Sequence, residues 1–232
     1  MTEQVRPEVL ISRLTAENEI WRVEAETRLV VLGQLAVDPL IGALQHAHAS
    51  VRVHAVHALG QIKDRRAIPA VVSALADTEN NGAVAIAAEK ALINWGEDAK
   101  PALMDAASHG AEHVRPRALR ALGRIGGDDL RPFLERLLQD RIAPVRTQAA
   151  AALGAALQER SIELIAPLLR DPDKWVRYGV AEALVRCGSV RGESALREAN
   201  EDPEEQGGYL RHWAEELLDE IEELKRTGRA LA

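Results

Sequence analysis

The sequence predicts an all-α protein built as an α-solenoid, and three observations lead to this fold class. Hydrophobic residues make up 47% of the 232 residues but aromatic residues only 3%, so small aliphatic side chains dominate. One sequence pattern returns about every 31 residues along the chain. Within each copy, apolar residues follow helical spacing. Two helices per repeat that are apolar on one face must stack on neighbouring repeats to bury that face.

The repeat is clearest in its first helix, which we call helix A. The string VRVHAVHALG at 51 returns as VRPRALRALG at 114, VRTQAAAALG at 145 and VRYGVAEALV at 176, and looser copies start at 21 and 84. Apolar residues fall at i, i+4, i+7 and i+8, as in Val51, Ala55, Ala58 and Leu59, which is one face of an α-helix. We therefore expect a helix A near 21, 51, 84, 114, 145 and 176.

A turn and a second helix, helix B, are expected after each helix A. Glycines recur where helix A should end, and glycine is the residue best suited to a left-handed helix end. These are Gly33, Gly60, Gly96, Gly123, Gly154 and Gly188. Proline is tolerated in a first helical turn, and four copies of helix B have one near their start. These are Pro39, Pro69, Pro101 and Pro132.

The two ends are expected to cap the stack. Residues 7–17 or so predict an N-terminal capping helix, and residues 209–226 or so a C-terminal one. Solenoids need such caps because their end repeats would otherwise expose apolar surface. We predict that residues 1–232 form a single repeat domain of about six to seven helix pairs.

The pattern VR-x-x-A-x-x-ALG, followed by segments such as AIPAVVSALAD at 67–77, resembles the HEAT-like repeat of the phycobilisome-lyase type over roughly residues 7–224. The resemblance implies a right-handed superhelix with helices A on the convex side and helices B lining the concave side. It also implies a protein-binding scaffold, or, in fewer members, a bilin lyase subunit, a di-iron hydroxylase of the deoxyhypusine type or a DNA glycosylase.

Composition argues against two of these activities. The hydroxylases ligate iron with adjacent His-Glu pairs, and the chain has no His-Glu dipeptide. A net charge of −7 is unfavourable for binding nucleic acid. We therefore predict a non-catalytic scaffold or adaptor for another protein or peptide, with a bilin lyase-type subunit or a chaperone for a chromophore-binding protein as the alternative. No cofactor is predicted, and whether the chain is an enzyme is left open, with a non-catalytic role favoured.

Partner binding is assigned to the concave surface, because solenoids bind there. The candidate residues are Val72, Met104, Asp105, Glu135, Arg136, Arg170 and Trp175. For Trp175, packing between adjacent repeats is the favoured interpretation, since large aromatic side chains are usually mostly buried. No apolar run is long enough to cross a membrane, and we expect a cytoplasmic protein.

Four of the seven histidines, His46, His48, His54 and His57, lie close together in the sequence. We predict no metal site here and interpret these histidines as solvated or capping side chains. The alternative is a metal site, which needs three or four ligands to converge on one ion. His54 and His57 share a surface of helix A, whereas His46 stands five residues before Val51, where other repeats have Asp140 or Asp171.

The arginine that follows the first residue of helix A recurs through the chain, at Arg22, Arg52, Arg115, Arg146, Arg177 and Arg211, and is replaced by Ala85 in one copy. With the acidic residues that precede helix A, these arginines predict a structural ladder of caps and ion pairs, and a phosphate-binding stripe is the alternative. Cys187 is the only cysteine, and we expect a partly buried structural thiol.

Overall fold

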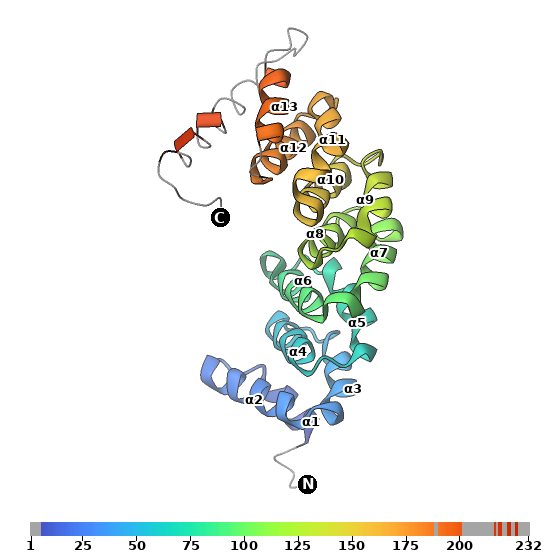
Figure 1. Ribbon diagram of the computed structural model, residues 1–232. Helices are drawn as coiled ribbons and strands as arrows, with labels where there is room; N and C mark the ends of the chain where they lie inside the picture. The colour runs from blue at the N-terminus through green and yellow to red at the C-terminus, as the bar shows by residue number, and fades with distance from the viewer. Residues whose placement is uncertain are drawn as a thin grey trace. The chain divides into compact units, whose positions relative to one another are not determined.

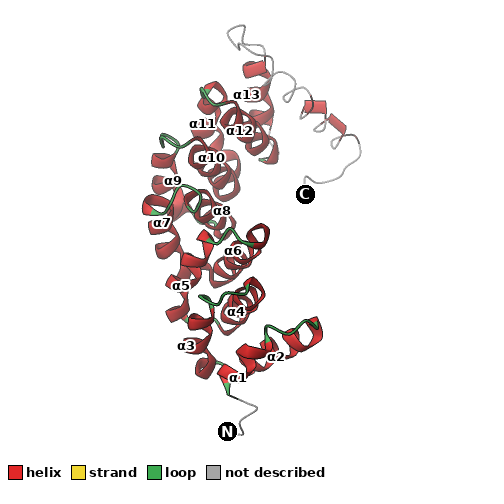
Figure 2. Ribbon diagram, turned by 180° about the vertical axis from the view of Figure 1, so that it is seen from behind, coloured by secondary structure: helices red, strands yellow, loops and turns green. Residues whose placement is uncertain are grey.

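A computed structural model describes residues 6–187 and 190–200, together with positions 216, 218, 219, 222, 223 and 226. Every regular element among these residues is a helix (Figure 2), so the all-α prediction is confirmed. None of the described helices is both long enough and apolar enough to cross a membrane. Gly188 and most of the predicted C-terminal capping helix lie outside the described residues.

The chain divides into two compact units, Met1–Ala121 and Leu122–Ala232, and the boundary falls within helix α8 (Arg115–Ile125). In the first unit, helices A form one layer and helices B a second layer beside it (Figure 1). The helix A layer consists of α2 (Glu19–Leu32), α4 (Ala49–Ile62) and α6 (Ala83–Trp95). The helix B layer consists of α1 (Pro7–Arg13), α3 (Gln34–Ala43), α5 (Ile68–Ser73) and α7 (Lys100–His109).

The second unit repeats the arrangement with α10 (Ala143–Leu157) and α12 (Lys174–Arg186) as helices A. Its helices B are α9 (Arg131–Leu137), α11 (Ile162–Ile165) and α13 (Val190–Asn200). All helices A begin within two residues of the positions at which the sequence pattern places them. The prediction that all 232 residues form one domain stays a prediction.

Aliphatic side chains fill the space between the layers. Leucines from both layers are fully buried, among them Leu29, Leu40, Leu59, Leu75, Leu92 and Leu103 in the first unit. The second unit buries Leu122, Leu130, Leu134 and Leu153 in the same way. Because neither helix of a pair could bury these side chains alone, removing apolar surface from water holds successive repeats together.

Only some of the glycines end helix A as predicted. Gly33 and Gly96 do so, with φ angles of 58° and 62°. Gly60, Gly123 and Gly154 instead lie inside α4, α8 and α10, so the prediction is wrong for these three. A Cβ atom on Gly60 would lie 2.8 Å from the Cβ of Ala91 in the next helix A, and one on Gly123 would lie 2.7 Å from Cα of Ala152. These glycines serve the close approach of neighbouring helices.

The start of helix B also differs in the first repeat. Pro69, Pro101 and Pro132 lie in the first turn of their helices, as predicted. Short 3-10 helices precede these three helices, at Arg65–Ala67, Gly96–Ala99 and Asp128–Leu130. In the first repeat the corresponding residues join α3 itself, which begins directly after Gly33, so Pro39 lies inside that helix.

Candidate functional site

The arginine near the start of helix A caps the helix B before it. In Arg146, Nη1 donates to the carbonyl of Asp140 at 2.8 Å, while Nε and Nη2 donate to the carboxylate of Asp171 at 2.8 and 2.7 Å. One guanidinium therefore joins the loop before its own helix to the loop of the next repeat. In such a bidentate pair, hydrogen bonding and charge reinforce each other.

Arg52 repeats this arrangement in the first unit. Its Nη1 donates to the carbonyl of His46 at 2.7 Å, and its other nitrogens donate to Asp77 at 2.7 Å and Glu79 at 2.6 Å. Arg52 is only 7% exposed. These arginines are occupied within the fold, which confirms the structural ladder and does not favour the phosphate stripe.

His46 takes the place of an aspartate, as the sequence predicts. Its Nδ1 accepts a hydrogen bond from the His48 amide at 3.1 Å, just as Oδ1 of Asp171 accepts one from the Asp173 amide at 2.8 Å. Because His46 has no carboxylate, however, it cannot pair with Arg22 of the preceding repeat as Asp171 pairs with Arg146. Nε of Arg22 is buried and has no hydrogen-bond partner.

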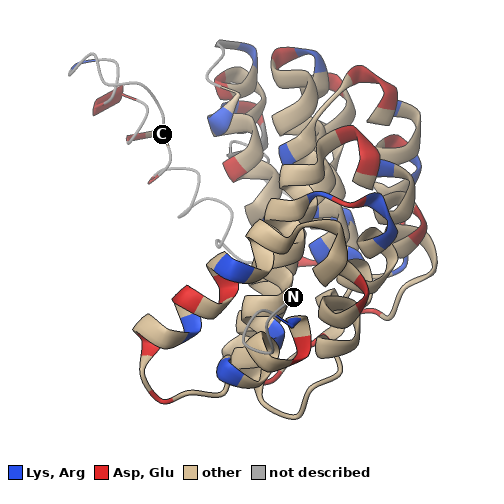
Figure 3. Ribbon diagram, turned by 90° about the horizontal axis from the view of Figure 1, so that it is seen from below, with Lys and Arg blue, Asp and Glu red and all other residues tan. Residues whose placement is uncertain are grey.

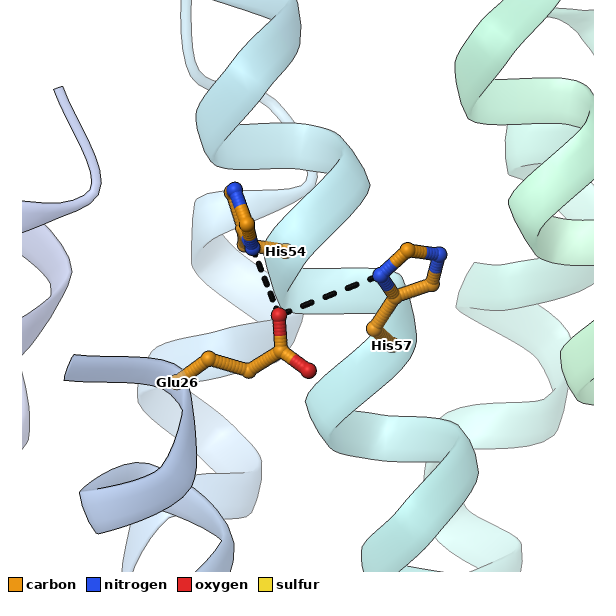
Figure 4. A group of neighbouring side chains, drawn as sticks. All are labelled: Glu26, His54 and His57. Carbon is orange, nitrogen blue, oxygen red and sulfur yellow. Dashed lines mark hydrogen bonds and ion pairs between the residues drawn. The ribbon is translucent and has the colours of Figure 1, made fainter. Parts of the chain in front are cut away.

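His54 and His57 converge with a third residue, Glu26, which the local sequence pattern does not single out. Both lie on α4 and face Glu26 on α2, as Figure 4 shows. Nδ1 of His54 lies 2.5 Å from Oε2 of Glu26, and Nδ1 of His57 lies 3.8 Å from the same oxygen. Among the described residues, this is the one group of three potential metal ligands whose ligand atoms all lie within 4.8 Å of one another.

The surroundings of Glu26 keep it ionised and oriented. Burial alone would raise the pKa of Glu26, but its interactions with His54 and His57 lower that pKa to about 2. Its other oxygen, Oε1, accepts a hydrogen bond from Nε2 of Gln61 at 3.1 Å. The carboxylate is thus held with Oε2 toward the two imidazoles. His46 and His48 do not join this group and stack on each other, with ring centroids 5.4 Å apart, so the alternative in which all four histidines converge is not found.

The third and fourth repeats show what the same positions do with other side chains. Glu89 stands five residues after the start of its repeat, as Glu26 does, and Arg120 stands six residues after, as His57 does. Arg120 donates to both oxygens of Glu89, at 2.8 and 2.5 Å. A glutamate that faces a basic side chain on the next helix A is therefore a recurring contact. The shared position of Glu26 and Glu89 within their repeats is the signal that could have identified Glu26.

The predicted partner-binding residues lie in both units and are treated separately. In the first unit, Val72 on α5 and Met104 on α7 are half-buried, whereas Asp105 is exposed and pairs with His109 at 3.0 Å. In the second unit, Glu135 pairs with Arg131 on α9 at 2.6 Å.

Arg136, Arg170 and Trp175, the other predicted contacts in the second unit, are all exposed. Arg136 is exposed, and its guanidinium lies over the ring of Phe133 at 5.5 Å, while Arg170 is exposed at the end of the 3-10 helix Ala166–Arg170. Trp175 is 58% exposed and packs edge-on against Tyr178 of its own helix. The expectation that Trp175 is mostly buried between repeats is wrong, because the first turn of α12 directs it outward.

Two surface features of the first unit were not predicted. The apolar side chains of Ile20, Trp21, Val31 and Leu35 are 60% exposed or more, and a hollow of about 370 Å³ beside Trp21 is also lined by Arg13 and Arg28. An open groove of about 520 Å³ lies beside the ladder residues Arg52, Asp77 and Glu79. Figure 3 shows basic and acidic positions interspersed over the helices and loops, so the charge is mixed rather than of one sign.

Cys187 has the environment of a structural thiol. It is half-buried, and its Sγ lies 3.5 Å from the carbonyl oxygen of Gln158 and 3.7 Å from Oγ of Ser161. Burial raises the pKa of the Cys187 thiol, and the hydrogen bond with Ser161 only partly offsets this effect.

Comparison with known proteins places this repeat in a family. The sequence model for HEAT repeats matches residues 7–93, 78–154 and 143–219. The chain belongs to the HEAT-repeat family. It is also 32% identical to a phycobilisome maturation protein of Synechococcus elongatus, over 71% of this chain and 89% of that relative.

Solved structures give likenesses of lower identity. The complex of CpcE and CpcF of phycocyanin lyase from Nostoc sp. PCC7120 is 23% identical, with a TM-score of 0.42 over 93% of this chain and 94% of that chain. An archaeal HEAT-like repeats protein from Thermococcus onnurineus NA1 is 14% identical, with a TM-score of 0.49 over 94% and 97% of the two chains.

Proposed function

We propose that this HEAT-repeat chain acts in the maturation of a phycobilisome protein, as a subunit of a bilin lyase or as a chaperone for a chromophore-binding protein. The observation that carries the proposal is the 32% identity to the phycobilisome maturation protein, which extends over 89% of that relative. This role replaces the general scaffold as the first candidate. A fold alone does not determine function, so the specific relative is the stronger argument.

The chain's own chemistry favours a role through protein binding over covalent handling of the bilin. A covalent carrier needs a reactive thiolate, and Cys187 is the only cysteine. Its thiol is half-buried and its pKa is raised, both of which lower its reactivity. We therefore propose that the acceptor protein is held on exposed side chains of the repeat surface.

Several exposed or half-buried side chains are suited to such contacts. Tryptophan and arginine are enriched among residues that dominate binding energy at protein interfaces. Trp175 and Arg136 in the second unit are both exposed, and Met104 in the first unit is a flexible apolar side chain on α7. A general scaffold for an unrelated protein is the second candidate, favoured by the same exposed side chains.

Co-expression of the full chain with a phycobiliprotein apoprotein and a source of bilin tests the proposal. We expect the apoprotein to co-purify with the chain, and the yield of coloured holoprotein, measured by absorbance, to rise when the chain is present. Arg136→Glu and Met104→Glu should weaken co-purification. Arg124→Glu is the matched control, since it makes the same charge change in the last turn of a helix A.

The outcomes separate the alternatives. Co-purification with increased holoprotein indicates a lyase subunit, and co-purification with improved solubility of the apoprotein alone indicates a chaperone. If no phycobiliprotein subunit co-purifies and holoprotein yield does not change, the phycobilisome role is wrong and the scaffold for another protein becomes the first candidate.

A further inference from the structure

We propose that Glu26, His54 and His57 form a binding site for one divalent transition-metal ion of the zinc class, with two imidazole nitrogens and one carboxylate oxygen as ligands. This site goes beyond the proposed function and does not depend on it. Two histidines and one carboxylate are a common ligand set for zinc and other divalent first-row metals. The three side chains come from two neighbouring helices A, so the fold itself brings them together.

The present distances need little change to hold an ion. Ligand atoms 2.0–2.2 Å from a tetrahedral metal lie roughly 3.3–3.5 Å from one another. Oε2 of Glu26 lies 2.5 Å from Nδ1 of His54 and 3.8 Å from Nδ1 of His57, so one distance must lengthen and the other shorten, each by less than about 1 Å. Side-chain rotation within existing helices can supply this change.

Protonation and orientation also fit metal binding. Each imidazole presents Nδ1 to the carboxylate (Figure 4), and Nδ1–H of His54 donates to the ionised Glu26. A bound ion would take the place of this proton, and the neutral ring with its proton on Nε2 would then use Nδ1 as a ligand. Gln61 holds the opposite carboxylate oxygen at 3.1 Å, as residues around metal sites commonly orient their ligands. His57 is 44% exposed, which gives an ion and its remaining water ligands a route from solvent.

Comparison with the fourth repeat indicates that this cluster does more than join two helices. There, Arg120 satisfies Glu89 completely with a bidentate ion pair, and a guanidinium cannot ligate a metal. The second repeat meets the corresponding glutamate with two imidazoles instead. The structure therefore supplies a natural control, because His57→Arg should rebuild the Glu89–Arg120 type of pair without the metal ligand.

Titration of the untagged full chain with ZnCl₂ by calorimetry tests the site, with Co²⁺ absorbance as a second readout of ligand geometry. We expect one equivalent to bind, and His57→Arg and Glu26→Gln each to weaken binding at least tenfold. His48→Ala should leave binding unchanged, because His48 stacks on His46 outside the cluster. Circular dichroism checks that each variant is folded.

Wild-type protein provides an independent measurement if a variant fails to fold. Zinc should shift the imidazole NMR signals of His54 and His57 and leave those of His109 and His113 in place. The proposal is overturned if no equivalent binds at millimolar zinc, if His48→Ala abolishes binding while His57→Arg keeps it, or if zinc shifts other histidines instead. In each of those cases Glu26, His54 and His57 form only a hydrogen-bonded bridge between helices.

Discussion

Replacing His46 with aspartate should stabilise the chain, because it completes the arginine ladder in the first repeat. The structure shows the two features that this substitution changes. His46 makes the turn contact that Asp171 makes elsewhere, and the Nε donor of Arg22 is buried without a partner. In His46→Asp, Oδ1 can keep the turn contact with the amide of residue 48 while Oδ2 accepts from Arg22, as Asp171 does for Arg146.

The size of the effect follows from the missing hydrogen bond. An unsatisfied buried donor costs about 1–3 kcal/mol, and hydrogen bonds to charged groups contribute about 1.5–3 kcal/mol. Two effects reduce the gain: the His46–His48 ring contact is lost, and residue 46 and Arg22 are only half-buried, so water screens their interaction. We therefore expect the free energy of unfolding to rise by about 1–2 kcal/mol. For a chain of this length, that corresponds to a rise in Tm of roughly 3–6 °C.

Thermal unfolding followed by circular dichroism measures the change, and a double-mutant cycle assigns it. In an Arg22→Gln background the stabilisation by His46→Asp should disappear, because the new carboxylate then lacks its cationic partner. The reasoning is refuted if His46→Asp leaves Tm unchanged or lowers it. It is also refuted if the same gain persists without Arg22.

Three further predictions concern packing, capping and the thiol. Gly60→Ala should destabilise the chain by about 1–3 kcal/mol in urea unfolding, since its Cβ would lie 2.8 Å from that of Ala91. Gly42→Ala, where nothing lies within 4 Å, should be neutral or stabilising by about 0.4–1 kcal/mol, and an equal loss at both positions would contradict the packing argument. Asp173→Ala should cost about 1 kcal/mol in urea unfolding, because Asp173 caps α12 through the amides of Trp175 and Val176; an unchanged midpoint would contradict this role. Cys187 should react more slowly with an aromatic disulfide reagent at pH 7.5 in the native chain than in the urea-unfolded chain, since burial raises its pKa; equal rates would show an accessible thiolate.

The sequence was sufficient to locate the helices because helical spacing of apolar residues is a local property. The starts of α4 and α10 follow directly from Val51 and Val145 with their periodic neighbours. The equivalence of His46 with Asp171 also followed from register alone, and the hydrogen bonds bear it out.

Other features depend on contacts between repeats that no local pattern specifies. The sequence predicts a helix end at Gly60, because a left-handed turn and a close helix approach both require the absence of Cβ; only the position of Ala91 distinguishes the two. Glu26 is not predictable from a local pattern, because it lies 28 residues before His54 and meets it only through the stacking of α2 on α4. The exposure of Trp175 likewise depends on how α12 is oriented, which composition does not reveal.

The arginine caps have a consequence for how the repeats come apart. In a linear array, stability is approximately the sum of each repeat's own free energy and the coupling to its nearest neighbours. Arg52 and Arg146 each contribute to both quantities. Each donates to a carbonyl in the loop before its own helix, which stabilises its own repeat, and to a carboxylate in the loop of the following repeat, which adds to the coupling. Arg22 has no acidic partner at Nε, so the coupling between the first and second repeats lacks this contribution. Unfolding of the first unit should therefore begin at α1 and α2 and proceed inward, which gives the N-terminal repeats freedom to open while the rest of the unit stays folded.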